Sequence, residues 1–308
     1  MITSPPTVPG AFSVLIPAYK SAGYIIPALT AVAAQSRQPA EVLIYEDGRF
    51  DDLAKQVAIF AESAPFPIQL TSVQKNTGVS TARNFLLHAA RGEYIAFLDA
   101  DDVWAPDHLA NAAACFATGA DVAFSGVTFL DPAGCVLPGS AEPSAADLAN
   151  IAAVMFRYNF VQCTSTLSLR RSWIGRVGVF DPALSHGEDL DLWLRLLAAG
   201  AVWRYTGRTS CAYRKHPSSA MGQTRLASAR LTAFYEKQLG NPLLPRAQRR
   251  AALLDNLWVN ARLSWRDDPW SAAAACRRLA QLQPWNPAAL AGWLFCASRA
   301  RAVRRQSA

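Results

Sequence analysis

Short apolar runs alternate with longer amphipathic stretches along the first third of the chain. In order, the pattern predicts strand 13–16, helix 25–34, strand 41–45, helix 53–63, strand 68–72, helix 81–90 and strand 94–98. Apolar strands separated by helices are typical of a parallel sheet with helices on both faces. The pattern therefore predicts an α/β fold with a Rossmann-like, mostly parallel sheet.

The rest of the chain has a less regular pattern. Three prolines interrupt residues 131–160, which we interpret as a connecting segment. Residues 161–169 alternate as a strand does, and an apolar-faced helix follows whose first turn carries Glu188, Asp189 and Asp191. Beyond residue 221 the pattern is helical and rich in Ala, Arg and Trp, and prolines divide it into short helices.

Composition indicates a folded protein. Hydrophobic residues make up 51% of the 308 residues and charged residues 17%, which argues against disorder. The six cysteines are far apart and form no C-x-x-C pair, so we expect reduced thiols, neither a disulfide framework nor a zinc site. We find no signal-peptide pattern and no apolar run of the ~18 to 20 residues that a membrane span needs. These observations predict a cytoplasmic protein.

The charge is unevenly distributed. Residues 1–220 hold 16 Lys and Arg against 19 Asp and Glu, whereas residues 221–308 hold 14 against 4, a net charge of +10. Such a basic segment indicates an anionic partner, either membrane lipid or nucleic acid. No nucleic-acid-binding module supports the second, so we expect no nucleic acid partner.

Candidate ligand-binding residues follow the predicted strands. In open α/β sheets, ligands bind beyond the carboxyl ends of the strands. The polar or exposed positions there are Pro17, Ala18, Tyr19, Glu46, Asp47, Gly48, Asn76, Gly78, Ser80, Arg83, Asp99 and Asp101. Neither a G-x-G-x-x-G motif nor a P-loop is present, so a nucleotide would depend on a metal and on Arg.

Three carboxylates directly after the last of these strands indicate a cation site. Asp99, Asp101 and Asp102 would repel one another and raise each other's pKa. A hard divalent ion, Mg²⁺ or Mn²⁺, shared with substrate phosphates would relieve this repulsion. The alternative is an acidic turn that caps the helix beginning near Pro106. An EF-hand is excluded, because Trp104 stands where that loop requires Gly.

Five motifs give the chain a recognisable resemblance. V-L-I-P-A-Y, E-D-G, N-T-G-V-S-T-A-R-N, F-L-D-A-D-D and G-E-D-L-D-L-W-L-R-L occur in the order and spacing of glycosyltransferase family 2, over about residues 12–216. The resemblance implies the A-type glycosyltransferase fold, with a nucleotide-binding part at about 12–130 and an acceptor-binding part at about 131–220. Residues 221–308 would then be a basic helical extension.

The resemblance also implies the reaction. A sugar would pass from a nucleoside diphosphate sugar, with UDP as the expected carrier, to a hydroxyl of the acceptor with inversion at the anomeric carbon. The acceptor would be a saccharide or a lipid-linked saccharide in bacterial surface-polysaccharide or glycoconjugate assembly.

Individual roles follow from the matched motifs. The donor-binding residues would be Pro17, Ala18, Tyr19, Asp47, Asn76, Arg83 and Asp99, the metal ligands Asp101, Asp99 and His216, and the catalytic residues Asp189 and Glu188. Tyr19 would stack on the base, and Asp47 would accept a hydrogen bond from a ring N–H. Asp189 would be the general base that takes the proton of the acceptor hydroxyl, while Glu188 binds the acceptor or supports the loop.

Some of these residues have a simpler interpretation. Glu188 and Asp189 could stabilise the N-terminus of a helix, and His216 could be a solvated loop residue. The E-D-G turn also departs from the family pattern, because Glu46, Arg49 and Phe50 replace the usual Asp, Ser and Thr. Arg49 could meet a diphosphate or point to solvent, and donor selectivity is open.

The C-terminal segment suggests a membrane contact. Leu290, Trp293, Leu294 and Ala297 recur at helical spacing, and Arg299, Arg301, Arg304 and Arg305 follow. An interfacial helix on an anionic membrane would have this pattern, which would place the protein at the inner face of the membrane. The alternative is a helix packed on the catalytic domain with a frayed basic end.

Two other functions were weighed. A catalytically silent scaffold that binds carbohydrate or nucleotide would be expected to lack Asp101, Arg83 or Asp189, yet all three are present. A sugar nucleotidyltransferase would need a loop rich in Gly and in Lys or Arg after the first strand, and P-A-Y-K-S-A-G matches this poorly.

Overall fold

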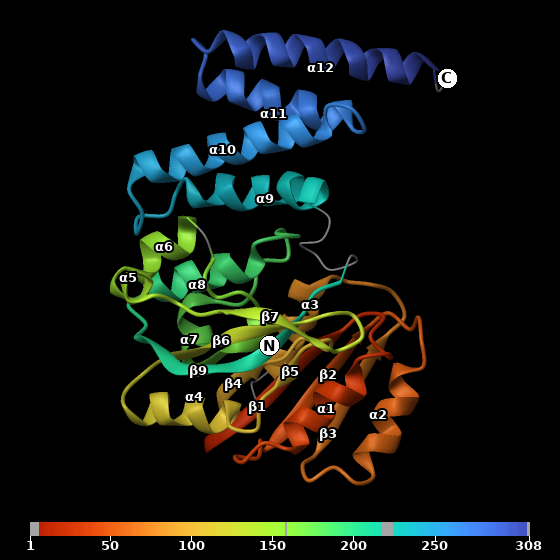
Figure 1. Ribbon diagram of the computed structural model, residues 1–308, viewed down its shortest axis with the longest axis vertical. Helices are drawn as coiled ribbons and strands as arrows, with labels where there is room; N and C mark the ends of the chain where they lie inside the picture. The colour runs from red at the N-terminus through yellow and green to blue at the C-terminus, as the bar shows by residue number, and fades with distance from the viewer. Residues whose placement is uncertain (1–5, 158, 217–223, 307–308) are drawn as a thin grey trace. The chain divides into compact units, whose positions relative to one another are not determined.

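The computed structural model describes residues 6–157, 159–216 and 224–306 (Figure 1). The chain divides into two compact units. Unit 1 comprises Met1–Ala183 and Glu188–His216, and unit 2 comprises Leu184–Gly187 and Pro217–Ala308. Unit 1 is the α/β part that the sequence predicts, and unit 2 is helical.

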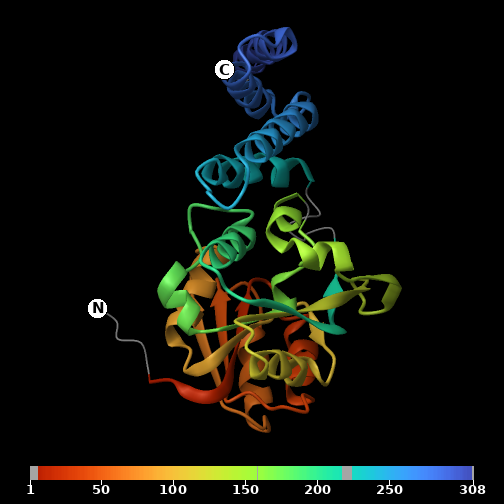
Figure 2. The ribbon, with the colours of Figure 1, turned by 90° about the vertical axis from the view of Figure 1, so that its left-hand side faces the viewer.

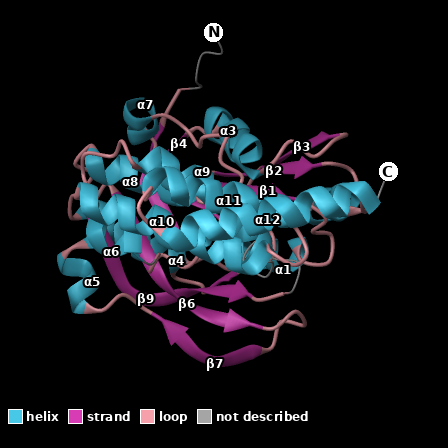
Figure 3. Cartoon of the chain, turned by 90° about the horizontal axis from the view of Figure 1, so that it is seen from above, coloured by secondary structure: helices cyan, strands magenta, loops and turns pink. Residues whose placement is uncertain are grey.

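One mixed sheet of nine strands organises the described part of unit 1. The strands are β1 Val8–Ala18, β2 Glu41–Asp47, β3 Ile68–Val73, β4 Gly92–Phe97, β5 Val103–Trp104, β6 Val122–Leu130, β7 Val136–Ala141, β8 Leu167–Arg170 and β9 Trp203–Arg214. Their order is β3-β2-β1-β4-β8-β6-β9-β5, and β7 pairs with β6. Figure 3 shows β2 and β3 at one side of the unit and β6, β7 and β9 at the other.

Strand direction changes at the middle of the sheet. β1 pairs in parallel with β2 and β4, and β2 pairs in parallel with β3. β8 lies antiparallel between β4 and β6, while β6 and β9 are parallel. The prediction of a mostly parallel sheet is therefore right for β1 to β4, and the second half of the sheet is mixed.

The helices of unit 1 agree closely with the predicted pattern in its first third. They are α1 Ile25–Ala33, α2 Leu53–Ala61, α3 Val79–Ala89, α4 His108–Ala117, α5 Ala145–Ala149, α6 Ile151–Arg157, α7 Ser172–Val177 and α8 Glu188–Ala198. Two interpretations need correction. Residues 131–160 contain β7, α5 and α6. The predicted strand 161–169 is a strand over its last three residues, which belong to β8, and a short 3₁₀ helix, η1 Thr164–Thr166, precedes them.

Alternating positions of the strands build two cores. Val14, Ile16 and Ile44 belong to one apolar cluster with α1, α2 and α4. On the other face, the ring of Phe97 lies 5.6 Å from that of Phe180 and 6.2 Å from that of Trp193 in α8. α3 also packs on β1 and β2. The first turns of α3 and α8 therefore reach the same region of the sheet.

A buried polar network joins β1, β2 and β4. Glu41, which is 1% exposed, accepts hydrogen bonds from Ser13 Oγ at 2.6 Å and from Arg91 Nε at 2.9 Å. The Gly92 N–H in turn donates to Ser13 Oγ at 2.8 Å. The pairing satisfies a carboxylate that would otherwise be costly to bury.

Unit 2 consists of consecutive helices (Figure 2). They are α9 Thr224–Gln238, α10 Arg246–Ser264, α11 Pro269–Leu282 and α12 Pro287–Gln306. α10, α11 and α12 share an apolar core that includes Leu253, Leu257 and Leu279. α10 and α12 are longer than the short helices that the prolines suggest. Within the described residues, no helix has both the length and the apolar composition needed to cross a membrane.

The apolar positions of α12 do not form the single stripe that the sequence suggests. Trp293 and Ala297 pack against the core of unit 2, whereas Leu290 is 47% exposed and Leu294 59% exposed. The helix therefore has one face that serves packing and a second exposed apolar strip. The side chains of Arg304 and Arg305 lie outside the described part of the chain.

Gly92 offers a direct test of the packing between β1 and β4. A Cβ at this position would lie 2.6 Å from Ser13 N and 2.8 Å from Ala11 O, both backbone atoms. We expect Gly92→Ala to lower the free energy of unfolding by about 1 to 3 kcal/mol, because neither strand can move away without loss of the ladder. Urea unfolding measures this.

The matched control is Gly175→Ala in α7, where an added Cβ meets no atom within 4 Å. That change should be neutral or stabilise by up to about 1 kcal/mol, because Ala is the better helix former. Equal stabilities of the two variants would contradict the packing described for Gly92.

Candidate active site

The carboxyl ends of β1, β2 and β4 meet at one edge of the sheet. The register pairs Ala18 of β1 with Glu46 of β2, and Leu15 with Phe97 of β4. Tyr19, Asp47 and the loop that begins at Leu98 therefore leave the sheet at this edge, as the sequence predicts. The carboxylates that follow β4 lie beside side chains from α3 and α8.

Arg83 is the centre of this cluster. Its side chain lies in α3, is 5% exposed, and donates from Nη2 to Asp99 Oδ1 and from Nη1 to Glu188 Oε1, each at 2.9 Å. Burial would lower the pKa of Arg83, but the two carboxylates outweigh burial and raise it above its usual range. Its buried Nε has no hydrogen-bond partner among the described residues.

Asp189 is the carboxylate that Arg83 does not bind. It lies beside Glu188 in the first turn of α8, and its Oδ1 accepts a hydrogen bond from Leu190 N at 2.7 Å. Burial and the neighbouring Glu188 raise the pKa of Asp189 to about 6, and the charge of Arg83 opposes this rise. A carboxylate with such a pKa is partly ionised near neutral pH and is a stronger base than an ordinary Asp.

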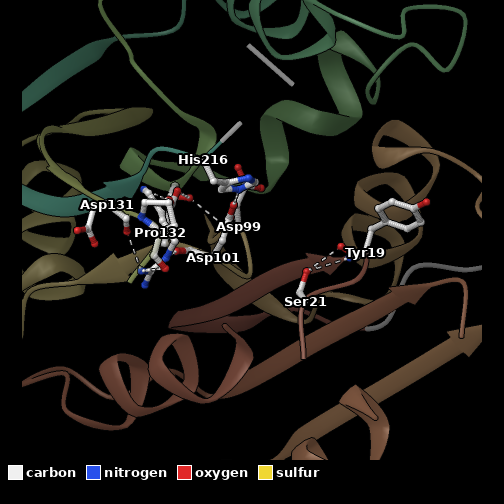
Figure 4. Close-up of polar contacts among 10 residues, drawn as sticks. Tyr19, Ser21, Asp99, Asp101, Asp131, Pro132 and His216 are labelled. Atoms are coloured by element: carbon white, nitrogen blue, oxygen red, sulfur yellow. Dashed lines mark hydrogen bonds and ion pairs between the residues drawn. The ribbon is translucent and has the colours of Figure 1, made fainter. Parts of the chain in front are cut away.

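Asp101 and His216 form a second pair next to Asp99. His216 Nε2 lies 2.8 Å from Asp101 Oδ2, and the Tyr24 ring stacks on the imidazole at a centroid distance of 6.0 Å. Burial, and then the nearby Asp99, raise the pKa of Asp101, while the hydrogen bond from His216 lowers it. Figure 4 shows Asp99, Asp101 and His216 gathered together, with Tyr19 lying apart from them.

Asp102 has a different role from its two neighbours. It is 0% exposed and accepts hydrogen bonds from Ser165 Oγ at 2.5 Å and from Arg214 N at 3.0 Å. Ser165 Oγ also accepts from Asp99 N, and Arg214 Nε donates to Asp101 O, both at 2.9 Å. Asp102 therefore fixes the loop that presents Asp99 and Asp101. The capping alternative fails for Asp107, whose side chain makes no cap hydrogen bond to α4.

Asp47 also supports a loop. Its Oδ1 accepts hydrogen bonds from Thr77 N at 2.6 Å and Thr77 Oγ1 at 2.8 Å, and its Oδ2 accepts from Gly78 N at 2.9 Å. Gly78 has φ +91°, which favours glycine at the start of α3. Asp47 is 3% exposed, and both of its carboxylate oxygens already accept hydrogen bonds. An N–H of a nucleotide base would therefore have to share one of these oxygens. The sequence did not indicate this function.

The other predicted donor-binding residues differ in exposure. Ala18 is 2% exposed within the core, backbone included, while Pro17 is partly exposed. Asn76 is exposed and makes no side-chain hydrogen bond to any residue that the structure describes. Glu46 is buried, and neither of its carboxylate oxygens has a described partner.

Tyr19 has an aromatic neighbour that the sequence did not single out. The Tyr19 ring meets Phe50 edge to face at 5.3 Å, and Lys20 Nζ lies 5.4 Å and 5.1 Å from the two ring centroids. Both rings are about half exposed. Phe50 was noted only as a departure from the family pattern. Arg49 is exposed, which agrees with its interpretation as a solvent-directed residue.

The donor set suits a divalent cation. Asp101 supplies a carboxylate, His216 an imidazole, and Asp99 Oδ2 accepts no hydrogen bond from the described residues. Carboxylate oxygens suit Mg²⁺ and Mn²⁺, and an imidazole among them favours the transition metal. Among the described residues, the ligand atoms of Asp102, Cys163 and Cys211 lie within 4.8 Å of one another, and no such convergence is found for Asp99, Asp101 and His216. Asp102 is occupied by Ser165 and Arg214.

Comparison with known families agrees with this arrangement. Residues 13–133 match Glycosyl transferase family 2, and residues 94–266 match Glycosyl transferase family group 2. The chain is 29% identical over 211 residues to the UDP-Glc:alpha-D-GlcNAc-diphosphoundecaprenol beta-1,3-glucosyltransferase WfaP of Escherichia coli, with 67% of this chain and 78% of that protein covered. In two other relatives, the match covers a smaller share of the relative's own length, 33% in one and 16% in the other.

Solved structures share the fold. One is TarS of S. aureus in complex with UDP-GlcNAc, with TM-score 0.66, 18% identity, and 96% of this chain and 92% of that chain covered. Another is the mannosyltransferase PcManGT from Pyrobaculum calidifontis in complex with GDP-Man and Mn²⁺, with TM-score 0.61, 19% identity, and 96% and 88% covered. The likeness shows the A-type fold that the sequence predicts. Because the family models match residues 13–133 and 94–266 and the Escherichia coli relative agrees with them, the chain belongs to glycosyltransferase family 2.

Proposed function

We propose that the protein transfers a sugar from a UDP-sugar to a hydroxyl of a saccharide or lipid-linked acceptor, with inversion and with the help of a divalent metal. The name of the Escherichia coli relative states a UDP-Glc donor and an acceptor linked to diphosphoundecaprenol. The fold neighbour TarS was solved with UDP-GlcNAc. Assembly of a bacterial surface polysaccharide or glycoconjugate is the setting that this function implies, with the protein on the cytoplasmic side of the membrane.

One observation carries the proposal: Arg83 bridges Asp99 and Glu188 at 2.9 Å each. Asp99 belongs to the predicted donor side, and Glu188 precedes the predicted base. The bridge brings these two halves of a displacement reaction to one site. The positive charge of Arg83 would also attract the diphosphate of the donor.

Asp101, Asp99 and His216 would hold Mn²⁺ or Mg²⁺. The bound ion supplies Lewis-acid stabilisation of the charge that develops on the departing diphosphate. The imidazole of His216 is oriented by the Tyr24 ring, and the backbone of Asp101 is held by Arg214. These contacts would fix the donor's phosphate end before reaction.

The opposite side of the displacement belongs to Asp189. Inversion in one step requires one base to take the proton of the acceptor hydroxyl as that oxygen attacks the anomeric carbon. Glu188 is bound to Arg83, which leaves Asp189 as the carboxylate of the pair that can accept a proton. Glu188 would keep α8 at the correct distance from the donor.

The nucleotide base would lie at the end of β1. Tyr19 and Phe50 present half-exposed rings there, and Pro17 is partly exposed beside them. Asp47 would act by holding the Thr77–Gly78 turn, with Asn76 exposed next to it. Aromatic faces bind any base, so this arrangement by itself does not select uracil.

Replacement of one carboxylate tests the metal site. We expect Asp101→Asn to weaken Mn²⁺-dependent binding of a UDP-sugar by about tenfold or more, because the neutral amide is a poor ligand for a hard cation. Isothermal titration with UDP-, GDP- and dTDP-sugars, with and without Mn²⁺, measures binding and identifies the carrier. Asp52→Asn, an exposed carboxylate at the start of α2, is the control. If no nucleotide sugar binds with any metal, a silent scaffold is the better explanation.

The pH profile tests the base. Because Asp189 must be ionised to accept a proton and its pKa is about 6, kcat/KM should fall as the pH drops below about 6. Burial raises this pKa most, the charges of Glu188 and Asp99 raise it further, and the charge of Arg83 opposes the rise. Asp189→Asn should lower kcat by about 10²- to 10⁴-fold, remove this acidic limb and leave donor binding unchanged. If Asp189→Asn still shows the fall in kcat/KM below about pH 6, another group is responsible for that fall.

The exposed strip of α12 carries the proposed membrane contact. Leu290 and Leu294 are exposed, and Arg301 is exposed beyond them on the same helix. We expect the pair Leu290→Gln and Leu294→Gln to reduce co-sedimentation with anionic vesicles, since burial of the two leucines in the interface is lost. Ile59→Gln, which alters an exposed apolar residue of α2, is the control. Unchanged co-sedimentation of the variant would show that Leu290 and Leu294 are not the membrane contact.

A further inference from the structure

Unit 2 contains an apolar groove that the proposed reaction does not use. It has a volume of about 660 Å³ and lies between α10 and α12, with Cys276 of α11 at its floor. We call it the α10–α12 groove; its apolar lining is Trp258, Val259, Trp265, Cys276, Phe295 and Cys296. This volume and this apolar lining are typical of a ligand site, and the volume is larger than that of an ordinary packing defect.

The groove follows from how the helices pack. α10 and α12 both pack on α11, and a core that includes Leu253, Leu257 and Ala289 is closed between them. Trp258, Val259 and Arg262 lie on the neighbouring face of α10, at helical spacing. The rings of Trp265 and Phe295 come within 6.3 Å of each other and connect the two sides.

Its aromatic walls remain accessible. Phe295 is 56% exposed, and Trp258 and Trp265 are partly exposed. When large apolar side chains border a concave surface, that surface is more often a binding site than a surface that contacts only water. A flat membrane surface would fit the exposed Leu290 and Leu294 strip better than it fits a groove.

Positive charge surrounds the groove. The guanidinium groups of Arg266 and Arg299 lie 4.7 Å and 5.5 Å from the Trp265 ring centroid, and Arg262 lines the groove itself. None of these three arginines forms an ion pair with a carboxylate in the described part of the chain. Asp255 is the acidic residue of the lining. The groove therefore complements a ligand with an apolar chain and an anionic end.

We propose that the α10–α12 groove binds the prenyl chain of an acceptor carried on a prenyl diphosphate, with Arg262, Arg266 and Arg299 attracting the phosphates. The inference rests on the proposed function and names its acceptor class. A prenyl chain matches the apolar walls of the groove, and its diphosphate matches guanidinium groups that have no carboxylate partner among the described residues.

Farnesyl diphosphate is the probe that tests this inference. It is titrated into the full-length protein without divalent cations, so that the metal site in unit 1 does not hold its diphosphate. We expect binding that quenches tryptophan fluorescence, and binding of inorganic diphosphate about tenfold weaker or more, because it lacks the apolar chain. Equal binding of both probes would overturn the proposal in favour of a free-phosphate site.

Variants locate the site. Phe295→Asp and Arg262→Glu change exposed side chains, so the fold should persist, and each should weaken farnesyl diphosphate binding by about tenfold. Val259→Trp fills the groove and should have the same effect. The matched controls are Arg301→Glu, an exposed arginine outside the lining, and Trp285→Ala, which is 94% exposed. Equal losses in the controls and in the groove variants would overturn the assignment.

Donor binding separates this inference from the function on which it rests. The groove variants should bind a UDP-sugar with Mn²⁺ as the native chain does. If the native chain binds the UDP-sugar but not farnesyl diphosphate, the groove proposal is wrong and the transferase proposal stands. If it binds no nucleotide sugar, the transferase proposal fails, and with it the identification of the acceptor.

Discussion

The buried guanidinium of Arg83 is the interaction on which the site depends. A charged group with 5% exposure is stable only if it is paired, and Arg83 is paired twice, with Asp99 and with Glu188. The pairing joins α3, the end of β4 and the start of α8, which are distant in sequence. It also neutralises carboxylates that would otherwise repel one another. Burial and the neighbouring Glu188 raise the pKa of Asp189, and the charge of Arg83, which binds Glu188, only partly opposes this rise.

The loop after β4 shows how three adjacent carboxylates acquire different properties. Asp102 turns inward to Ser165 and the backbone of Arg214, and this anchors the loop. Asp99 faces Arg83, and Asp101 faces His216. Ser165 follows the 131–160 segment and Arg214 ends β9, so the second half of the unit holds the acidic loop of the first half. An altered loop geometry would therefore disturb Asp99 and Asp101 together.

In unit 2, some apolar residues form the core and others are exposed on the surface. Its core takes Trp293 and Ala297 from α12, while Leu290 and Leu294 remain exposed. The same packing on α11 leaves the groove between α10 and α12, bordered by arginines. Three arginines of this basic segment, Arg262, Arg266 and Arg299, thus lie beside apolar surface. This combination suits amphiphilic ligands, because an anionic headgroup and an apolar chain are then satisfied side by side.

The sequence by itself determined the alternating strands and helices up to β4, the family, and the carboxylates at the carboxyl edge of the sheet, because local periodicity and short motifs carry that information. It did not determine the mixed half of the sheet, β7 with α5 and α6, or the partition of α12 into two faces. Only the tertiary structure assigned Asp102 and Asp47 to loop support and paired Arg83 with Glu188. Those roles depend on contacts between residues such as 83 and 188, which the chain brings together only when long-range packing has fixed α3 and α8 on one face of the sheet.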